Sequence, residues 1–508
     1  MSLDRRAQLA HGSPALAGAT LAESPRAAPP ELVMQNAASL ATLIRDHQVS
    51  CVEVMTAHLD QIDRLNPKVN AIVSLQPREG LLAQAAERDR QLAAGQHLGW
   101  LHGMPLAVKD LAQTKGIVTT FGSPLLRDFV PTVDAIVVER MKAAGGIVIG
   151  KTNTPEWGLG SQTYNEVFGT TLNAYDQGRT AGGSSGGAAV ALALRLVPVA
   201  DGSDMAGSLR NPAAFNNVFG FRPSAGRVPY GPALELFMQQ LGYEGPMARS
   251  VQDLALLLAV QAGPDPRAPL SLEQDPRVFA GPLERNLAGL RVGWLGDLGG
   301  YLPIEPGVLE LCGDGLAVLQ TLGCPVEAAV PDYPPEQVWD TWRKLRHFLV
   351  GGALRPLHRD PAKRALLKPE AVWEVEGLER LSAADVYAAT TARSAWYAAL
   401  RRLFARFDYL ALPTAQVFPF DAALHWPREV AGRGMDTYHR WMEVVVGVTL
   451  AGLPAISVPV GFDPRGLPMG MQLVGRHHDD LGLLQLAHAY DAATQWPAKR
   501  PPALLTAG

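Results

Sequence analysis

The apolar positions of the chain switch repeatedly between the spacing of a helix and that of a buried strand. Residues 39–65 carry apolar side chains three and four positions apart, and we expect this helix to stop at Asn66-Pro67. Residues 133–144 and 188–196 are also predicted to be helical. Short apolar runs typical of buried strands lie at 105–108, 147–149, 197–200, 218–221, 290–295, 409–412, 456–460 and 471–474. The alternation predicts an α/β fold in which one sheet collects the strands.

Residues 330–441 differ in composition from the rest of the chain, because they are rich in aromatic residues. We expect them to form a helical, aromatic-rich cap region within a single domain of residues 31–508. Large aromatic side chains dominate core burial, so packing is favoured over pocket lining for these residues. The segment holds six of the ten tryptophans, namely Trp339, Trp342, Trp373, Trp396, Trp426 and Trp441.

Residues 1–30 are interpreted as a disordered N-terminal tail. Arg5 and Arg6 precede an alanine-rich stretch, but residues 11–14 interrupt the apolar run that a signal peptide requires. Elsewhere no apolar run reaches the roughly 18 residues that span a bilayer. We therefore expect no membrane-integral segment.

Composition narrows the class of partner. With 45 basic and 49 acidic residues, the net charge is −4. The chain therefore lacks the excess of positive charge that binds nucleic acid or an anionic membrane, and we expect a small, uncharged ligand. Cys51, Cys312 and Cys324 are an odd set without C-x-x-C spacing, which favours neither a disulfide framework nor a zinc site. A reducing, cytoplasmic location fits this pattern, and a homodimer is compatible with it.

Three polar residues in separate segments carry the candidate chemistry. They are Lys109 at the end of an apolar run, and Ser184 and Ser208 in glycine-rich turns 24 residues apart. A serine is a poor nucleophile unless a base takes its proton, and a lysine serves as that base only when its pKa is lowered. The three segments could supply a base, a relay and a nucleophile.

The turn around Ser208 has the composition of an oxyanion hole. The backbone amides of Met205, Ala206, Gly207 and Ser208 could converge on one oxygen. Asp204 and Arg210 on either side are predicted to be a buried structural pair, because an arginine does not deprotonate.

Two other interpretations of these segments remain open from the residues alone. Lys109 and Asp110 could be a solvated pair at a strand end. Residues 182–186 also satisfy G-x-S-x-G, the nucleophile elbow of α/β-hydrolases, with Ser184 as nucleophile of an esterase. The elbow requires a strand directly before the serine, whereas residues 176–181 form a polar turn, and the histidines sit in no recognisable frame. The histidines considered are His439, His477 and His478.

Taken together, the motifs resemble the amidase signature family from about residue 38 onward. The matching segments are 65–71, 103–110, 150–156, the serine-rich stretch up to Phe221-Arg-Pro-Ser224, 407–414, 451–455 and 466–475. The resemblance implies a large mixed sheet covered by helices on both faces and a cis peptide bond between Gly183 and Ser184. It also implies a Ser-cisSer-Lys triad with Ser208 as nucleophile, Ser184 as relay and Lys109 as base, supported by Gly183, Ser185, Asp204 and Arg210. Such a triad needs no metal or organic cofactor.

The resemblance predicts a serine amidohydrolase that uses water to cleave a small or medium linear, cyclic or aryl amide. The alternatives are the transamidating subunit of a tRNA-dependent amidotransferase and a non-catalytic scaffold with the same fold. Two positions depart from the family pattern: Ala206 replaces a glycine, and Ala181 replaces a proline. Alanine at 206 would be strained at positive φ, so we expect an allowed φ there and a slightly narrower site.

Overall fold

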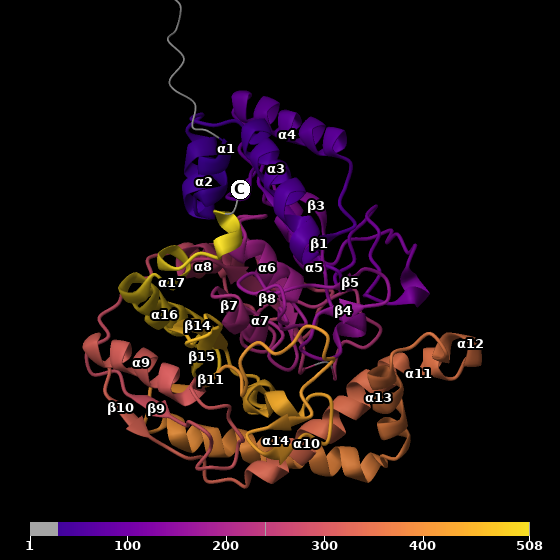
Figure 1. Ribbon diagram of the computed structural model, residues 1–508, viewed down its shortest axis with the longest axis vertical. Coiled ribbons are helices and arrows are strands. Elements are labelled where there is room, and N and C mark those ends of the chain that lie inside the picture. Colours follow the sequence, from indigo (N-terminus) through magenta and orange to yellow (C-terminus); the bar gives the residue numbers. More distant parts are fainter. Residues whose placement is uncertain (1–28, 239, 507–508) are drawn as a thin grey trace, which may run out of the picture.

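A computed structural model describes residues 29–238 and 240–506 (Figure 1). Residues 1–28 of the predicted N-terminal tail lie outside these described residues. Within them, no helix is both long and apolar enough to cross a membrane.

The centre of the molecule is an eight-stranded mixed sheet with the strand order β10-β9-β11-β15-β14-β7-β8-β6. The pairs β10/β9 and β9/β11 are parallel, and the remaining pairs are antiparallel. The strands are β6 Ala200–Asp204, β7 Phe219–Arg222, β8 Tyr243–Ala248, β9 Val292–Trp294, β10 Val326–Ala328, β11 Tyr409–Pro413, β14 Ala455–Phe462 and β15 Pro468–Val474.

A second sheet of three strands has the order β1-β3-β2 and lies beside the β6 end of the large sheet. Its strands are β1 Ile72–Val73, β2 Pro105–Lys109 and β3 Ile147–Thr152. The expectation that one sheet collects all strands therefore holds for the large sheet but not for residues 105–108 and 147–149. These two runs pair with each other in parallel.

Helices cover both faces of the large sheet. Successive strand residues point to opposite faces, and on β15 Gly470 lies against Ala214 of α7, whereas Met471 lies near Gly315 of α9. Helices α6 and α7 form one layer, and α8, α9 and α16 form the other. The bounds of these helices are α6 Gly186–Ala193, α7 Arg210–Phe215, α8 Val251–Gln261, α9 Val308–Thr321 and α16 Asp480–Thr494.

Most of the remaining helices lie at the periphery, whereas α15 (Val446–Ala451) is almost entirely buried and packs against α10 and α14. Helices at the N-terminal end stand at the top of Figure 1, α10 and α14 lie along its lower edge, and α11, α12 and α13 lie on its right-hand side. Their bounds are α1 Pro29–Met34, α2 Ala37–Arg45, α3 Cys51–Val69, α4 Arg78–Ala93, α5 Ile136–Ala143, α10 Pro335–Arg346, α11 Gly352–His358, α12 Pro361–Arg364, α13 Pro369–Glu379, α14 Ala383–Phe404, α15 Val446–Ala451 and α17 Trp496–Lys499.

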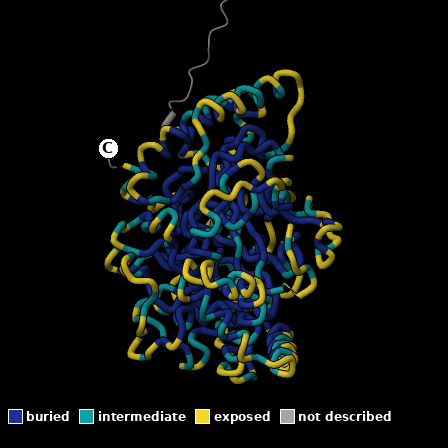
Figure 2. The backbone as a smooth tube through the Cα atoms, turned by 90° about the vertical axis from the view of Figure 1, so that its right-hand side faces the viewer, coloured by how far each residue is buried: buried dark blue, intermediate teal, exposed yellow. Residues whose placement is uncertain are grey.

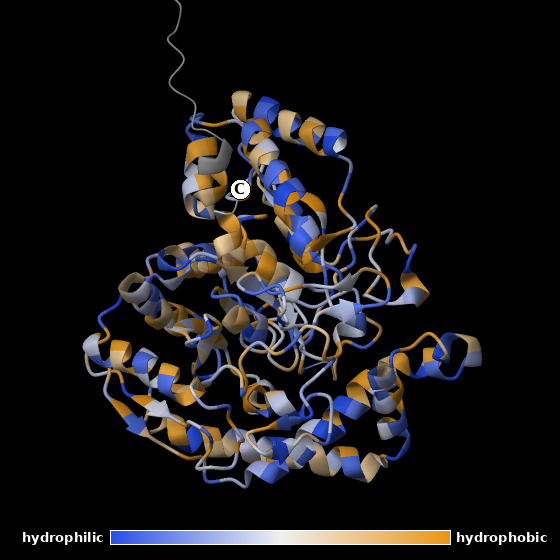
Figure 3. Cartoon of the chain, in the orientation of Figure 1, coloured by the Kyte–Doolittle hydropathy of each residue, from blue (hydrophilic) through white to orange (hydrophobic). Residues whose placement is uncertain are grey.

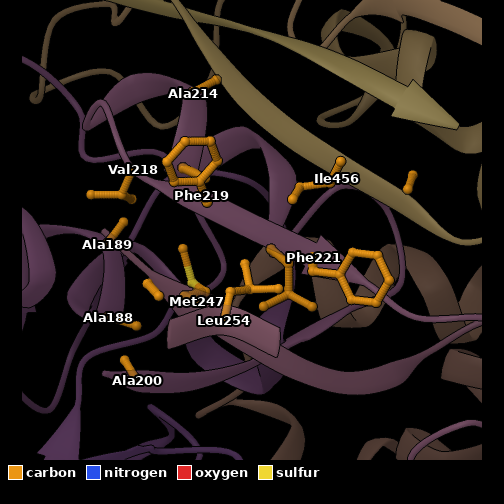
Figure 4. Packing of buried hydrophobic residues seen from close by; sticks show 14 of the residues in the cluster. Ala188, Ala189, Ala200, Ala214, Val218, Phe219, Phe221, Met247, Leu254 and Ile456 are labelled. Atoms are coloured by element: carbon orange, nitrogen blue, oxygen red, sulfur yellow. The ribbon is translucent and has the colours of Figure 1, made fainter. Parts of the chain in front are cut away.

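Burial follows these layers. The interior is continuous and the exposed residues form an outer shell (Figure 2), and peripheral helices such as α3 show apolar and polar positions in alternation (Figure 3). Helix α6 is buried along its whole length and packs its alanines near Phe219 and Met247 of the adjacent strands (Figure 4). The glycine-rich turn that precedes α6 is thus held by a rigid support.

Two predicted elements differ in detail from the structure. Residues 39–65 form two helices, because Ser50 caps a new helix in a capping box with Glu53. The stop at Asn66-Pro67 was wrong, since α3 continues to Val69 and ends at Asn70 in the left-handed region. The predicted strand 197–200 begins only at Ala200 and runs on through the polar residues to Asp204.

The segment 330–441 contains helices α10 to α14, followed by strand β11, which belongs to the large sheet. Its helical part therefore ends at Phe404. A single domain with a cap region remains a prediction.

Candidate active site

Lys109 is the last residue of β2 and is fully buried. Its ammonium group donates hydrogen bonds to Ser184 Oγ and Ser185 Oγ, both at 2.8 Å, and to Ser203 Oγ at 3.0 Å. Its backbone amide donates to the Asp201 carboxylate at 3.1 Å. A solvated Lys109–Asp110 pair is therefore excluded, and Asp110 is likewise buried, accepting from Thr120.

The turn that carries Ser184 is held from outside by two hydroxyl groups. Ser161 Oγ donates to the Gly183 carbonyl at 2.7 Å, and Thr163 Oγ1 donates to the Gly182 carbonyl at 2.8 Å. The Gly183–Ser184 peptide bond is cis. The amide of Ser185 donates to the Ser208 carbonyl at 3.2 Å, which ties this turn to the turn carrying Ser208.

The predicted pair of Asp204 and Arg210 is present and extends to a third residue. Arg210 Nε donates to Asp204 Oδ2 at 3.0 Å, and Arg222 of β7 lies 3.2 Å from Asp204 Oδ1, with all three side chains fully buried. Burial raises the pKa of Asp204, but the two guanidinium groups lower it more, and it lies well below its usual range. Asp204 is thus a fixed anion at the base of the Ser208 turn.

The amides of that turn divide into two groups. Gly207 N–H donates to Asp204 Oδ1 at 2.9 Å. Among the described residues no acceptor is found for the amides of Met205, Ala206 and Ser208. Three of the four backbone amides predicted to form the oxyanion hole are therefore free to bind a substrate oxygen.

Ala206 does not occupy the left-handed region, as expected for an alanine. The position that requires a glycine is Gly207, with φ +82°. A Cβ there would lie 2.3 Å from Asn211 Oδ1.

The electrostatics around Lys109 favour loss of its proton. Burial lowers the pKa of Lys109 to about 8, against the opposing effects of Glu244, Asp201 and Asp204. A second buried lysine, Lys151, has its pKa lowered by burial to about 8 as well, but its ammonium group donates to the Ala112 carbonyl at 2.6 Å and Thr114 Oγ1 at 2.7 Å. Lys109 is the lysine that reaches the serines.

Ser184 and Ser208 open onto one cavity of about 690 Å³. Its walls are mostly apolar and come from several parts of the chain. They include Leu111, Phe121, Trp157, Tyr230 and Phe348. None of the six tryptophans of 330–441, all of them within the described residues, lines it. Trp339, Trp342, Trp396 and Trp441 are buried, as expected for core packing, whereas Trp373 and Trp426 are half-buried and Trp396 also lines a separate pocket.

The alternative with Ser184 on a nucleophile elbow lacks its structural context. The residues directly before Ser184 form no strand but only isolated bridges at Leu172, Arg179 and Thr180. His439, His477 and His478 do not line the cavity. Among the described residues no cluster of three or more His, Cys, Asp or Glu side chains could hold a metal ion.

Several residues of the site were not predicted as site residues from the sequence. Ser203, Asp201 and Glu244 surround Lys109, yet they lie on β6 and β8, and only the pairing of these strands brings them together. Arg222 reaches Asp204 in the same way from β7. The one sequence feature that could have indicated these site residues is the run of polar residues at 201–204, directly after an apolar run.

Comparison with known proteins agrees with this architecture. A sequence profile of the Amidase family matches residues 53–484. The chain is 35% identical to an acylamidase of Rhodococcus erythropolis over 92% of this chain and 97% of that protein. It is 36% identical to a glutamyl-tRNA(Gln) amidotransferase subunit of a Synechococcus species, over 91% of this chain and 97% of that protein.

Among solved structures, the chain is similar to a bacterial aryl acylamidase of the amidase signature family, with a TM-score of 0.85. That structure shares 30% sequence identity over 92% of this chain and 99% of its own. The fold and the sequence define this protein as an enzyme of the amidase class. The chain belongs to the Amidase family.

Proposed function

We propose that the chain is a serine amidohydrolase that forms an acyl-enzyme on Ser208. The observation that carries this proposal is the contact of the buried Lys109 ammonium group with Ser184 Oγ at 2.8 Å, in a cavity that Ser208 also lines. A lysine in this state is a base close to neutral pH. Ser184 relays the proton between Lys109 and Ser208.

The reaction begins with neutral Lys109. It takes the hydroxyl proton of Ser184 while Ser184 takes that of Ser208, and Ser208 Oγ attacks the amide carbonyl carbon. The free amides of residues 205, 206 and 208 stabilise the negative charge that forms on the carbonyl oxygen. The relay then runs backward and protonates the leaving nitrogen, so that the C–N bond breaks and the amine departs. Water attacks the remaining ester and releases the acid.

The cavity supports a substrate of small to medium size with apolar parts. A volume of about 690 Å³ fits the range of sites that bind drug-sized molecules, ~300–1,000 Å³. Apolar walls favour the acyl chain or aromatic ring of a linear, cyclic or aryl amide. One similar protein is named an acylamidase and another an aryl acylamidase.

A second candidate is the transamidating subunit of a tRNA-dependent amidotransferase, since the chain resembles one such protein and an acylamidase to the same degree. A protein of that kind would act with partner chains. The large apolar cavity favours the hydrolase, because glutamine is small and polar.

The test is a turnover assay of the purified chain alone on aliphatic amides, anilides, carbamates and esters. Ser208→Ala serves as the blank. We expect release of acid and amine from at least one amide, and none in the blank. Turnover of glutamine that requires added partner chains, with no other amide cleaved, would support the transamidating role instead.

A further inference from the structure

Glu244 is a buried carboxylate in the active-site cavity that the proposed mechanism does not use. It lies on β8 directly opposite Ser203 of β6, and cross-strand partners share one face of a sheet. Its side chain is only 6% exposed and lines the cavity together with Ser184, Ser203 and Ser208. Glu244 is therefore close to the reacting groups.

Glu244 has no partner of its own. Its Oε2 atom is buried without a hydrogen bond. Among the described residues it is the one buried carboxylate with neither a hydrogen bond nor an ion pair; each of the others has at least one, as Asp201 has with the Lys109 amide and Glu374 with Arg346. An unsatisfied buried carboxylate destabilises a fold. Groups of this kind are characteristic of binding sites.

The charged neighbours of Glu244 are already engaged. Lys109 is shared among three serine hydroxyls, and Lys151 binds Ala112 and Thr114. Asp201 adds a further negative charge, Tyr230 contributes a nearby phenol, and Asp204 is neutralised by its two arginines. Burial accordingly raises the pKa of Glu244 to about 8, helped by Asp201 and opposed by Lys109 and Lys151.

We propose that Glu244 binds a protonated amine that the substrate carries near its scissile amide. The proposal rests on the hydrolase function above and names its substrate class: amides with an apolar chain or ring that also bear an ammonium group. The mechanism requires Lys109 to be neutral, and in that state the cation closest to the serines is lost. A substrate ammonium group supplies the missing positive charge and binds the ionised form of the Glu244 carboxyl group, which its own charge favours by lowering the pKa of Glu244.

This substrate class differs from the uncharged ligand that the overall net charge of the chain favours. Net charge describes the whole surface, whereas Glu244 is a single group inside the cavity. The local group decides what the cavity binds.

The test compares two pairs of substrates of equal shape. One pair is an ω-aminoacyl anilide and the alkanoyl anilide of the same chain length, in which a methyl group replaces the ammonium group. The other pair carries the same exchange on the leaving amine. The readout is the ratio of kcat/KM within each pair, because any effect of a variant on Lys109 cancels in that ratio.

For wild type we expect the ammonium substrate of one pair to be preferred by about tenfold or more, the usual size of a hydrogen bond to a charged group. Glu244→Gln should reduce this preference to near unity. Glu235→Gln is the matched control, since Glu235 lines the same cavity but accepts hydrogen bonds from the amides of Phe237 and Met238. It should keep the ratio of wild type.

The proposal is overturned if neither pair shows a preference in wild type, or if Glu244→Gln leaves the preference intact. Should Glu244→Gln fold poorly, Glu244→Leu replaces the carboxylate by an apolar group of similar size and is expected to give the same loss. Calorimetric binding of an alkylammonium ion, compared with the matching alkanol, requires no turnover. Preferential binding that disappears in Glu244→Gln would support the subsite even if no amide were cleaved, and equal binding of both ligands would contradict it.

Discussion

The reactivity of single residues in this protein follows from what surrounds Lys109. Three hydroxyl groups accept from its ammonium group, and no carboxylate of the described part of the chain forms an ion pair with it, so burial outweighs the attraction of the more distant acids. An exposed lysine would remain protonated and unable to act as a base. The reactivity of Lys109 thus depends on its burial by the enclosing strands as much as on the amine itself.

The first prediction at this scale concerns pH. Because Lys109 has its pKa lowered to about 8 and acts only when neutral, kcat/KM should fall as the pH drops below about 8 and level off above it. Replacement by methionine should cost roughly 10²–10⁴-fold in kcat/KM and remove this limb. A profile that stays flat from acidic to alkaline pH in wild type, or wild-type rates in Lys109→Met, would exclude Lys109 as the base.

The second prediction separates two neighbouring positions of the Ser208 turn. Ala206→Gly restores the residue usual in the family and should cost only ~0.5–1 kcal/mol of unfolding free energy, since alanine is unstrained there. Gly207→Ala should cost more than this and abolish activity, because a Cβ collides with Asn211 in a backbone region that alanine resists. Denaturant unfolding with a parallel activity assay checks both. A milder effect at 207 than at 206 would contradict the assignment.

At the scale of elements, two strands and a helix converge on the Ser208 turn. Strand β6 leads into it, β7 contributes Arg222, and Arg210 begins α7 directly behind it. Asp204 joins them, so the position of the turn depends on a fully buried charge network.

Asp204→Asn tests this network. Removal of the carboxylate leaves Arg210 and Arg222 as buried, uncompensated charges, and breaking a buried pair in this way costs about 3–5 kcal/mol. The free energy of unfolding in urea is the measurement. Asp275→Asn, which breaks an exposed pair with Arg277, is the control and should leave the unfolding midpoint close to that of wild type. Equal effects of the two changes would contradict a structural role for Asp204.

The elements also show why sequence patterns predicted some features and missed others. The runs at 456–460 and 471–474 are uniformly apolar and were recognised as strands, whereas β8 was not, because Gly245-Pro246 has the composition of a turn. Polar residues 201–204 lie outside the predicted strand 197–200, although they continue β6 and pair with buried residues of β8. Glu244 was also missed, because only the register of β8 with β6 places it opposite Ser203 in the site.

At the scale of the whole molecule, the helical segment after α9 contacts the site through Arg346 and through residues that line the cavity. Arg346 of α10 donates to Glu374 of α13 at 2.7 Å and to Tyr438, and its Nη1 lies 3.2 Å from the sulfur of Met205. Arg346 and residues 348–350 also line the cavity. The segment therefore forms part of the cavity wall and supports the turn with the free amides.

The central claim is that Ser208, and not Ser184, is the nucleophile of this enzyme. The most direct measurement is covalent labelling of the purified chain with a fluorophosphonate, followed by mass spectrometry of the modified peptide. We predict an adduct on Ser208 that is absent in Ser208→Ala. An adduct on Ser184, or labelling that persists in Ser208→Ala and disappears in Ser184→Ala, would contradict the account.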